Sequence, residues 1–445
     1  MAFDASEQMK KQAENSQLLF LELNEVNFEQ VLHYVEQGRL PAFKAFFDKH
    51  GYETTSSEVE YEYLEPWIQW VTAHTGLSFA EHGIFRLGDI AHHDLPQIWE
   101  QVEARGQKVG AISPMNAKCR TKNASFFVPD PWTGGEVVAP GVLKRLYGSI
   151  AAAVNENASG RVTPRALIDL AIGGAVYARP RNWIRYASLV AGARSGAWRR
   201  ALFLDQLLAD VFVRSVRSAR PNFATLFLNA AAHIQHHYLY SSPAYSGPMK
   251  NPDWYVPDGE DPLFEVYALY DRVLADLQET FPTARIMIAT GLHQDPHDAI
   301  TFYWRLKDHE AFLRRLGATF QSVEPRMSRD FLVVCSDEAE ALETERRLTK
   351  AVAADGRPLF EIDNRGRDLF VMLTWPDDIP VNLSFSLDGR DLGPFKPHVA
   401  FVAIKNGRHN GVGYFSDSNA SGPLAAGSFK LAELPQRVLA AFSHV

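Results

Sequence analysis

The chain has few cysteines, no long apolar run and no apolar segment at its start. Its 445 residues include only Cys119 and Cys335, whose separation predicts neither a disulfide framework nor a thiolate metal site. No stretch approaches the roughly 18 apolar residues that a membrane-spanning helix needs. The first 17 residues are polar and charged, unlike a secretory signal. We therefore expect a globular protein of the cytoplasm.

An excess of positive charge is also missing, since the net charge is −8 at pH 7. This balance excludes a dedicated nucleic-acid binder, whose surface would be basic. Hydrophobic residues make up 46% of the chain and charged residues 22%, which is the composition of a globular protein. The length suits one large domain with insertions or two domains. The oligomeric state is not predicted.

Apolar runs alternate with amphipathic stretches along much of the chain. Short apolar runs bounded by polar turns are typical of buried parallel strands, and the longer periodic stretches are typical of helices. Their alternation predicts an α/β fold with a mostly parallel sheet. We expect strands at 18–23, 109–113, 223–228 and 285–290, and helices at 28–37, 41–50, 99–105 and 263–279.

The chain divides into five expected segments. The core α/β part is made of 1–116, 221–304 and 398–445, with a returning strand at 399–403 and a polar loop at 406–413. A mostly helical insertion is expected at 117–220. Residues 305–397 have the strand and helix pattern of a small α+β cap.

The helical insertion contains a basic stretch between residues 179 and 220. It has nine arginines against two aspartates, interleaved with Trp183, Tyr186 and Trp198. Such a stretch can contact anionic lipid at a membrane surface. A solvated helix face is the more common explanation, so both interpretations stand.

Three histidines follow the predicted strand 223–228. His233, His236 and His237 come directly after its end, where the sites of α/β proteins usually lie. Imidazole is the commonest protein ligand for zinc and similar metals. A solvated loop is the alternative explanation.

Several motifs occur in a recognisable order along the chain. They are Leu18–Asn24 with Gly38–Pro41, Thr75-Gly76-Leu77 with Glu81–Ile84, Ala232–His236, Ala289–His293 and His409. This order resembles the alkaline-phosphatase-like superfamily, in particular its phosphodiesterase and nucleotide-pyrophosphatase branch. The resemblance implies an alkaline-phosphatase-like core, with a mostly parallel central sheet flanked by helices, plus the insertion and the cap.

The resemblance fails at the residues that carry chemistry in that family, whose members hold two metal ions beside a nucleophilic Thr or Ser. Asn24 occupies the position at which one metal site of the family has an Asp ligand. Pro66 occupies the position of the nucleophilic Thr or Ser. Gly291 and Leu292 replace the Asp and His of an "SDHG" motif. Proline has no hydroxyl, so transfer through a protein nucleophile is not expected.

The other metal site of the family is better matched. His236 and His409 stand at its two His ligands, and only its Asp is replaced, by Ala232. His233 or His293 can supply a third nitrogen. The resemblance thus implies one divalent ion, with Zn²⁺ favoured over Mn or Fe. The alternative is that the chain binds no metal at either site and that the histidines are only polar residues lining a pocket.

Further candidates lie near these positions. Glu22 and Glu25 are candidate bases, although Glu22 can instead pair with a cation, and Gln69 stands where the family often steadies an oxyanion. We expect Asn24, Trp67 and Arg408 to contact substrate, although Trp67 can equally belong to the core.

The sequence therefore predicts a divergent hydrolase or group transferase acting through a reduced, mononuclear metal site. Its expected substrate is a phosphate or sulfate ester or a related anionic molecule, including a glycan- or lipid-linked one. The alternative is a non-catalytic relative that binds an anionic ligand or a partner protein in the pocket that corresponds to the active site of the family.

Overall fold

The computed structural model describes residues 17–155, 163–326, 328–420 and 427–442. The polar stretch at the start of the chain therefore lies outside the described residues, apart from Gln17. Small parts of four expected segments also lie outside them: the first core part, the helical insertion, the cap (residue 327) and the C-terminal core part.

A central eight-stranded sheet has the order β17-β2-β16-β6-β1-β5-β3-β4. The five strands from β6 to β4 are parallel, and β16 is antiparallel to both of its neighbours. This confirms the expected α/β class with a mostly parallel sheet. The strands are β1 (Leu18–Leu23), β2 (Glu53–Ser56), β3 (Val109–Ile112), β4 (Phe126–Val128), β5 (Phe223–Leu228), β6 (Arg285–Ala289), β16 (Val412–Asp417) and β17 (Ser428–Lys430).

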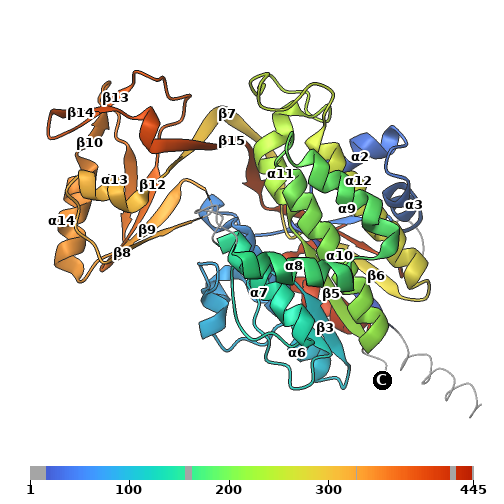
Figure 1. Ribbon diagram of the computed structural model, residues 1–445. Helices are drawn as coiled ribbons and strands as arrows, with labels where there is room; N and C mark the ends of the chain where they lie inside the picture. Colours follow the sequence, from blue (N-terminus) through green and yellow to red (C-terminus); the bar gives the residue numbers. More distant parts are fainter. Residues whose placement is uncertain (1–16, 156–162, 327, 421–426, 443–445) are drawn as a thin grey trace, which may run out of the picture.

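Helices cover both faces of this sheet (Figure 1). Because every residue of β1 and β5 is buried, these strands need the nearly unbroken apolar runs seen in the sequence. One face packs against α2 (Phe28–Glu36), α3 (Pro41–His50), α10 (Arg199–Ala219), α11 (Ala230–Tyr238) and α12 (Pro262–Thr280). The other face packs against α4 (Pro66–Thr75), α6 (Ile98–Glu103) and α15 (Leu434–Ala440).

The insertion also contains α7 (Gly141–Asn155), α8 (Pro164–Tyr177) and α9 (Trp183–Gly192). Helices α8 and α9 pack on the outside of α10, and α7 packs against α8. Before them, residues 126–128 join the central sheet as its edge strand β4. None of the helices in the described ranges combines the length and the apolar character that a membrane span requires.

A long two-stranded ribbon leaves the core and leads to a separate small lobe (Figure 1). It consists of β7 (His293–Leu306) and β15 (Val399–Asn410), which pair antiparallel. The expected strand at 399–403 is confirmed as a strand, but it lies in this ribbon and not in the core sheet. The expected loop at 406–413 was wrong, because residues 406–410 belong to β15 and residues 412–413 begin β16.

The lobe has its own apolar core between residues 302 and 404, which includes Phe331, Leu369 and Phe385. It contains the sheets β11-β12-β9-β8 and β10-β13-β14. Its elements are α13 (His309–Arg315), β8 (Ser322–Pro325), β9 (Asp330–Val334), α14 (Glu338–Thr349), β10 (Ala351–Ala353), β11 (Phe360–Asn364), β12 (Asp368–Leu373), β13 (Ser384–Leu387) and β14 (Arg390–Pro394).

Candidate metal centre

Glu25, His236 and His409 meet at the carboxyl edge of the central sheet. Glu25 Oε2 lies 3.1 Å from His236 Nε2 and 3.2 Å from His409 Nε2, and the two Nε2 atoms lie 3.1 Å apart. Glu25 is buried, while the two histidines are partly open to solvent. Three potential ligand atoms therefore converge on one point that solvent can reach.

The ends of neighbouring parallel strands bring Glu25 and His236 together. Leu23 at the end of β1 pairs with Leu228 at the end of β5, and α11 starts two residues later. The Glu25 N–H donates to Thr290 O at 3.1 Å, so the turn is fixed to the end of β6 as well. Glu25 has φ 60°, a left-handed conformation that costs a non-glycine residue about 1 kcal/mol. The turn is thus held in an unfavourable conformation that aims this carboxylate at His236.

Helix α11 is itself anchored by a buried carboxylate. Asp205 of α10 accepts hydrogen bonds from the Ala230 N–H, at the first residue of α11, and from the Tyr270 hydroxyl. Burial raises the pKa of Asp205 to about 6. Contrary to the loop alternative, the histidine cluster is therefore helical, and its side chains point in different directions.

The charges of the three groups are complementary. Burial alone would raise the pKa of Glu25, but His409 and His236 outweigh it and hold that pKa far below its ordinary value. Burial opposes a charge on His409, yet the Glu25 carboxylate keeps the pKa of His409 above its usual value. Glu65, which the sequence did not single out, lies with Oε2 3.7 Å from His409 Nδ1, and burial raises its pKa.

Gln294 is a second residue that the sequence analysis missed. Its Nε2 donates to Glu25 Oε2 at 2.5 Å and to Ala232 O at 3.0 Å. Gln294 is the cross-strand partner of His409, so both side chains lie on the same face of the ribbon. A Cβ at Gly407 would lie 1.9 Å from Gln294 Oε1, so a larger residue there would displace the Gln294 side chain. In the sequence, only the alternation of side chains in the strand after β6 could have indicated that Gln294 faces the centre.

His293 and His233 are not brought to the centre. His293 precedes Gln294 in β7 and therefore points to the opposite face, where its ring nitrogens contact Val412 O and Asp295. His233 is exposed on α11, three residues before His236, and its ring lies beside His237. In the described part of the chain, the group that can hold a metal consists of Glu25, His236 and His409.

The indole of Trp70 fills the space between Asn24 and Gly291. Trp70 Nε1 donates to Asn24 Oδ1 at 2.7 Å, and a Cβ at Gly291 would lie 3.1 Å from the Trp70 ring. Asn24 Nδ2 donates to Glu25 Oε1 and to Asn229 Oδ1. Asn24 is buried and positions Glu25.

The remaining expected residues serve other contacts. Glu22 is fully buried on the α4 side of the sheet, where Oε1 accepts from Thr225 at 2.6 Å and lies 3.2 Å from His74 Nε2. Gln69 is buried and donates to Tyr63 O. Trp67 donates to Phe85 O, and Arg408 is exposed beside Asp298. None of these contacts involves Glu25, His236 or His409.

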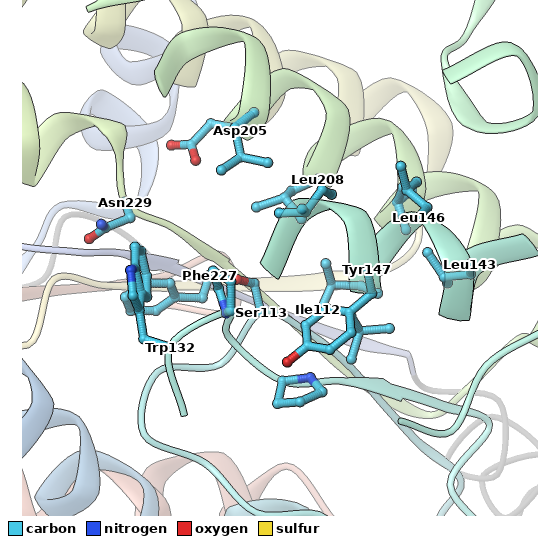
Figure 2. A pocket seen from close by; sticks show the side chains of 16 residues that line it. Ile112, Ser113, Trp132, Leu143, Leu146, Tyr147, Asp205, Leu208, Phe227 and Asn229 are labelled. Atoms are coloured by element: carbon cyan, nitrogen blue, oxygen red, sulfur yellow. The ribbon is translucent and has the colours of Figure 1, made fainter. Parts of the chain in front are cut away.

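A largely apolar pocket lies on the other side of Asn229, between the sheet, α7 and α10 (Figure 2). Asp205 and Asn229 line one end of it, and Asn229 also contacts Asn24. The pocket is lined by aliphatic and aromatic residues that include Ile112, Leu143, Leu146, Tyr147, Leu208 and Phe227.

The donor set fits a single divalent ion. The four ligands of a tetrahedral Zn²⁺ at about 2.0–2.1 Å lie roughly 3.3 Å from one another. The three contacts of 3.1–3.2 Å among Glu25, His236 and His409 match this spacing. Two imidazoles and a carboxylate leave a fourth position open, and the same set also suits Fe or Mn.

No protein-family model matches the chain, and no curated protein does so at a significant level. Solved structures similar to it include a phosphonoacetate hydrolase from Sinorhizobium meliloti 1021, at 13% identity and a TM-score of 0.45 over 96% of both chains. Human ectonucleotide pyrophosphatase/phosphodiesterase 5 matches at 10% identity and 0.42, over 96% of this chain and 95% of that chain. An alkaline phosphatase from the Antarctic bacterium TAB5 matches at 9% and 0.39, over 96% of this chain and 98% of that chain. The function proposed below rests on side chains of this chain.

Proposed function

We propose that this protein is an alkaline-phosphatase-like hydrolase or group transferase with a single divalent metal ion held by Glu25, His236 and His409. Its substrate is a phosphate or sulfate ester or a related anionic molecule. The observation that carries the proposal is the convergence of the three ligand atoms at contacts of 3.1–3.2 Å. Zn²⁺ is the favoured ion, because two histidines and a carboxylate form a common zinc ligand set.

The surrounding residues support this use of the site. A bound divalent ion would stabilise negative charge on an ester oxygen and activate water for attack. Glu65 faces His409 Nδ1 at 3.7 Å, so its carboxylate favours the tautomer with the proton on Nδ1 and the Nε2 lone pair free. Gln294 holds Glu25 Oε2 in place, and Asn24 holds its Oε1. Glu25 therefore acts as a ligand in this proposal, in place of the base expected from the sequence.

The proposal needs no nucleophile from the protein. Pro66 starts α4 at the position where the family has its hydroxyl, and Trp70 fills the space beside Asn24. Both features oppose a second ion and a covalent intermediate. Direct attack by water, or by an acceptor hydroxyl in a transferase, is the route that these residues leave open.

A group of cations beside the centre supports an anionic substrate. Burial and the charge of Arg329 lower the pKa of Lys405, which also senses Arg408 and Glu65. Arg329 comes from the cap and lies over the ring of Tyr303 at 4.4 Å. Lys405 and Arg329 make no ion pair within the described ranges, so both charges are free to bind a phosphate or sulfate group.

The non-catalytic alternative has one observation in its favour. Glu25 already accepts hydrogen bonds from Asn24 and Gln294 and pairs with both histidines. The three groups are thus compatible with one another without an ion. In that case Lys405, Arg329 and the site around Glu25 bind an anionic ligand or a partner protein and catalyse no reaction.

Metal content and hydrolysis separate the two functions. The protein is loaded with Zn²⁺ or Mn²⁺, desalted and analysed for bound metal, then assayed with p-nitrophenyl phosphate, bis(p-nitrophenyl) phosphate and p-nitrophenyl sulfate. We expect about one equivalent of metal and ester hydrolysis, both lost in His236→Ala and His409→Ala. His233→Ala is the matched control on the same helix. A wild-type protein that binds no metal would leave only the non-catalytic function.

A further inference from the structure

Helices α8 and α9 present an apolar face to solvent. Seven of the fourteen large hydrophobic side chains that are exposed in the described residues lie on these two helices. Ile184 is 87% exposed and Trp183 is 58% exposed, and large apolar side chains left exposed in such numbers mark an interaction surface. The seven are Leu167, Ile168, Ile172 and Val176 on α8, and Trp183, Ile184 and Val190 on α9.

The position of the two helices explains why this face has no partner inside the chain. Helix α10 contacts β3 and β5 of the sheet and also contacts α8 and α9, which therefore form an outer layer (Figure 1). The inner side of α8 carries Ala166, Gly173 and Tyr177, which are buried. A Cβ at Gly173 would lie 2.6 Å from Leu146 of α7, so this side is closely packed. The outer side carries the exposed aliphatic residues.

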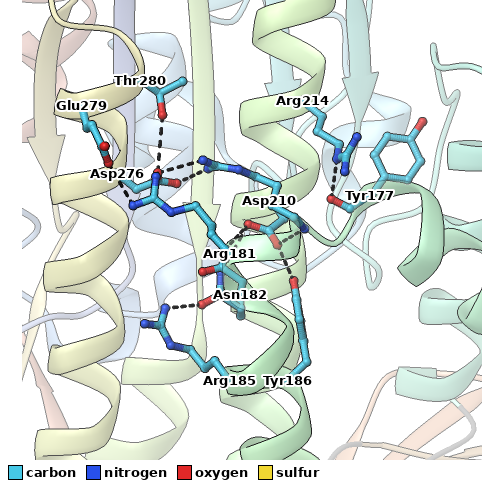
Figure 3. A network of polar contacts seen from close by, with 12 residues as sticks. Tyr177, Arg181, Asn182, Arg185, Tyr186, Asp210, Arg214, Asp276, Glu279 and Thr280 are labelled. Carbon is cyan, nitrogen blue, oxygen red and sulfur yellow. Dashed lines mark hydrogen bonds and ion pairs between the residues drawn. The ribbon is translucent and has the colours of Figure 1, made fainter.

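The turn between α8 and α9 is held rigidly (Figure 3). Asp210 of α10 accepts hydrogen bonds from the Arg179 N–H, Asn182 Nδ2 and the Tyr186 hydroxyl, at 2.7–2.9 Å. Arg214 donates to the carbonyl of Tyr177, the last residue of α8. Exposure of the face is therefore a property of the folded protein and not of a loosely attached segment.

The charged residues within this segment of the chain are almost all positive. Residues 163–200 contain seven arginines and one aspartate, with no lysine or glutamate. Arg179, Arg181 and Arg199 pair with carboxylates of the α12 region, so they are not available for a ligand. Arg165, Arg194 and Arg200 are exposed and make no ion pair with any other described residue.

We propose that the α8–α9 face rests on the surface of an anionic membrane. The aliphatic residues and Trp183 would enter the boundary between headgroups and acyl chains, and the free arginines would contact lipid phosphates. Two copies of this chain are a poor alternative, because pairing the faces would bring their arginines together. This surface is not the basic stretch 179–220 that the sequence analysis considered. Its exposed apolar residues lie between residues 167 and 190, and most of them are aliphatic.

Vesicle sedimentation tests this surface with the full chain. Wild-type protein is mixed with vesicles of phosphatidylcholine, with or without phosphatidylserine, at increasing salt. The apolar variant is I168S/I172S/I184S, and the charge variant is R165Q/R194Q/R200Q. The matched control is V59S/L342S/V381S, which changes three exposed hydrophobic residues elsewhere. Circular dichroism and thermal unfolding check that each variant is folded.

We expect salt-sensitive binding of the wild type and the control to phosphatidylserine vesicles only. The apolar variant should bind at least tenfold more weakly, and the charge variant should lose most of the salt dependence. Equal binding by the wild type and the apolar variant, or no binding by the wild type, would overturn the proposal. A wild-type protein that is a dimer by light scattering, together with an apolar variant that is a monomer, would also overturn it, because the face would then bind a second copy of the chain. Tighter binding of the wild type to polyglutamate than to vesicles would overturn it as well, because the face would then bind an acidic polypeptide.

Discussion

The Nε2 atoms of His236 and His409 lie 3.1 Å apart although the residues are 173 positions apart in the sequence. Their rings are inclined at 75°, and both Nε2 atoms approach Glu25 Oε2. One histidine comes from the helix after β5 and the other from the ribbon that leads to the cap. The centre therefore forms only when the core and the ribbon are both folded.

Replacement of Glu25 by glutamine should remove the metal while keeping the shape of the side chain. The amide is neutral and a weaker ligand than a carboxylate, so we expect the affinity for Zn²⁺ to fall by at least about 100-fold. Competition with a chromogenic chelator measures this change. Glu29→Gln, four residues along and exposed, should keep the wild-type affinity.

Gln294→Leu should weaken the centre without removing a ligand. Gln294 Nε2 holds Glu25 Oε2, and loss of such a supporting hydrogen bond typically lowers metal affinity by about 10–100-fold. The same chelator competition applies, with His293→Ala as control, since that side chain contacts Val412 O and Asp295. A larger effect of His293→Ala than of Gln294→Leu would contradict the assignment of the two faces of β7.

Asn24→Asp should not restore a second metal ion. The carboxylate would return, but the Trp70 indole still occupies the space toward Gly291, and Leu292 offers no ligand. We expect metal content to stay at about one equivalent by elemental analysis. Trp70→Ala should instead lower the free energy of unfolding by roughly 3–5 kcal/mol, because the ring is completely buried.

Asp205 predicts a specific dependence of stability on pH. Its folded-state pKa is raised from 3.8 to about 6, so between these values the folded protein binds a proton that the unfolded chain has released. The stabilisation is present below pH 4 and is lost as pH rises through 6, with a total of about 3 kcal/mol. The unfolding free energy of the wild type minus that of Asp205→Asn should therefore decrease from pH 4 to pH 7. A difference that stays constant would refute the raised pKa.

Lys405→Met should reduce the affinity for inorganic phosphate or sulfate as inhibitors. Loss of one charged contact is worth about 1.4 kcal/mol, so inhibition should weaken roughly tenfold. Lys430→Met, which changes an exposed lysine outside the centre, should leave inhibition unchanged. An equal effect of both variants would mean that inhibition follows net charge and not a site at Lys405.

The sequence predicted β1, β3, β5 and β6 of the central sheet, because buried parallel strands need nearly uninterrupted apolar runs, as in β1 and β5. It did not predict β2, β4, β16 and β17, which lie toward the two edges of the sheet. It also singled out Glu25, His236 and His409, which the structure brings together. It could not separate His293 from Gln294, because the choice depends on which residue starts β7, and a shift of one position reverses the faces. The ribbon itself was missed, since its polar residues between 406 and 410 have the composition of a loop.

Two further residues lay beyond sequence reasoning for another reason. Trp70 fills the space beside Asn24. The apolar sequence of α4 is the same whether this ring packs in the core or beside the candidate metal centre, so the sequence could not place it. Glu22 was placed near the pocket, yet the alternation of β1 sends it to the α4 side, where it meets His74. Partners that are distant in sequence decide both positions.

The ribbon of β7 and β15 has a consequence for how this protein can be altered. Gln294 and His409 are paired at its core end, and Leu306 pairs with Val399 at the cap end. Exchanging the cap for another lobe, or inserting one residue into either strand, would shift the alignment of a metal ligand with the side chain that holds Glu25. Shortening both strands together by an even number of residues is the change most compatible with an intact centre.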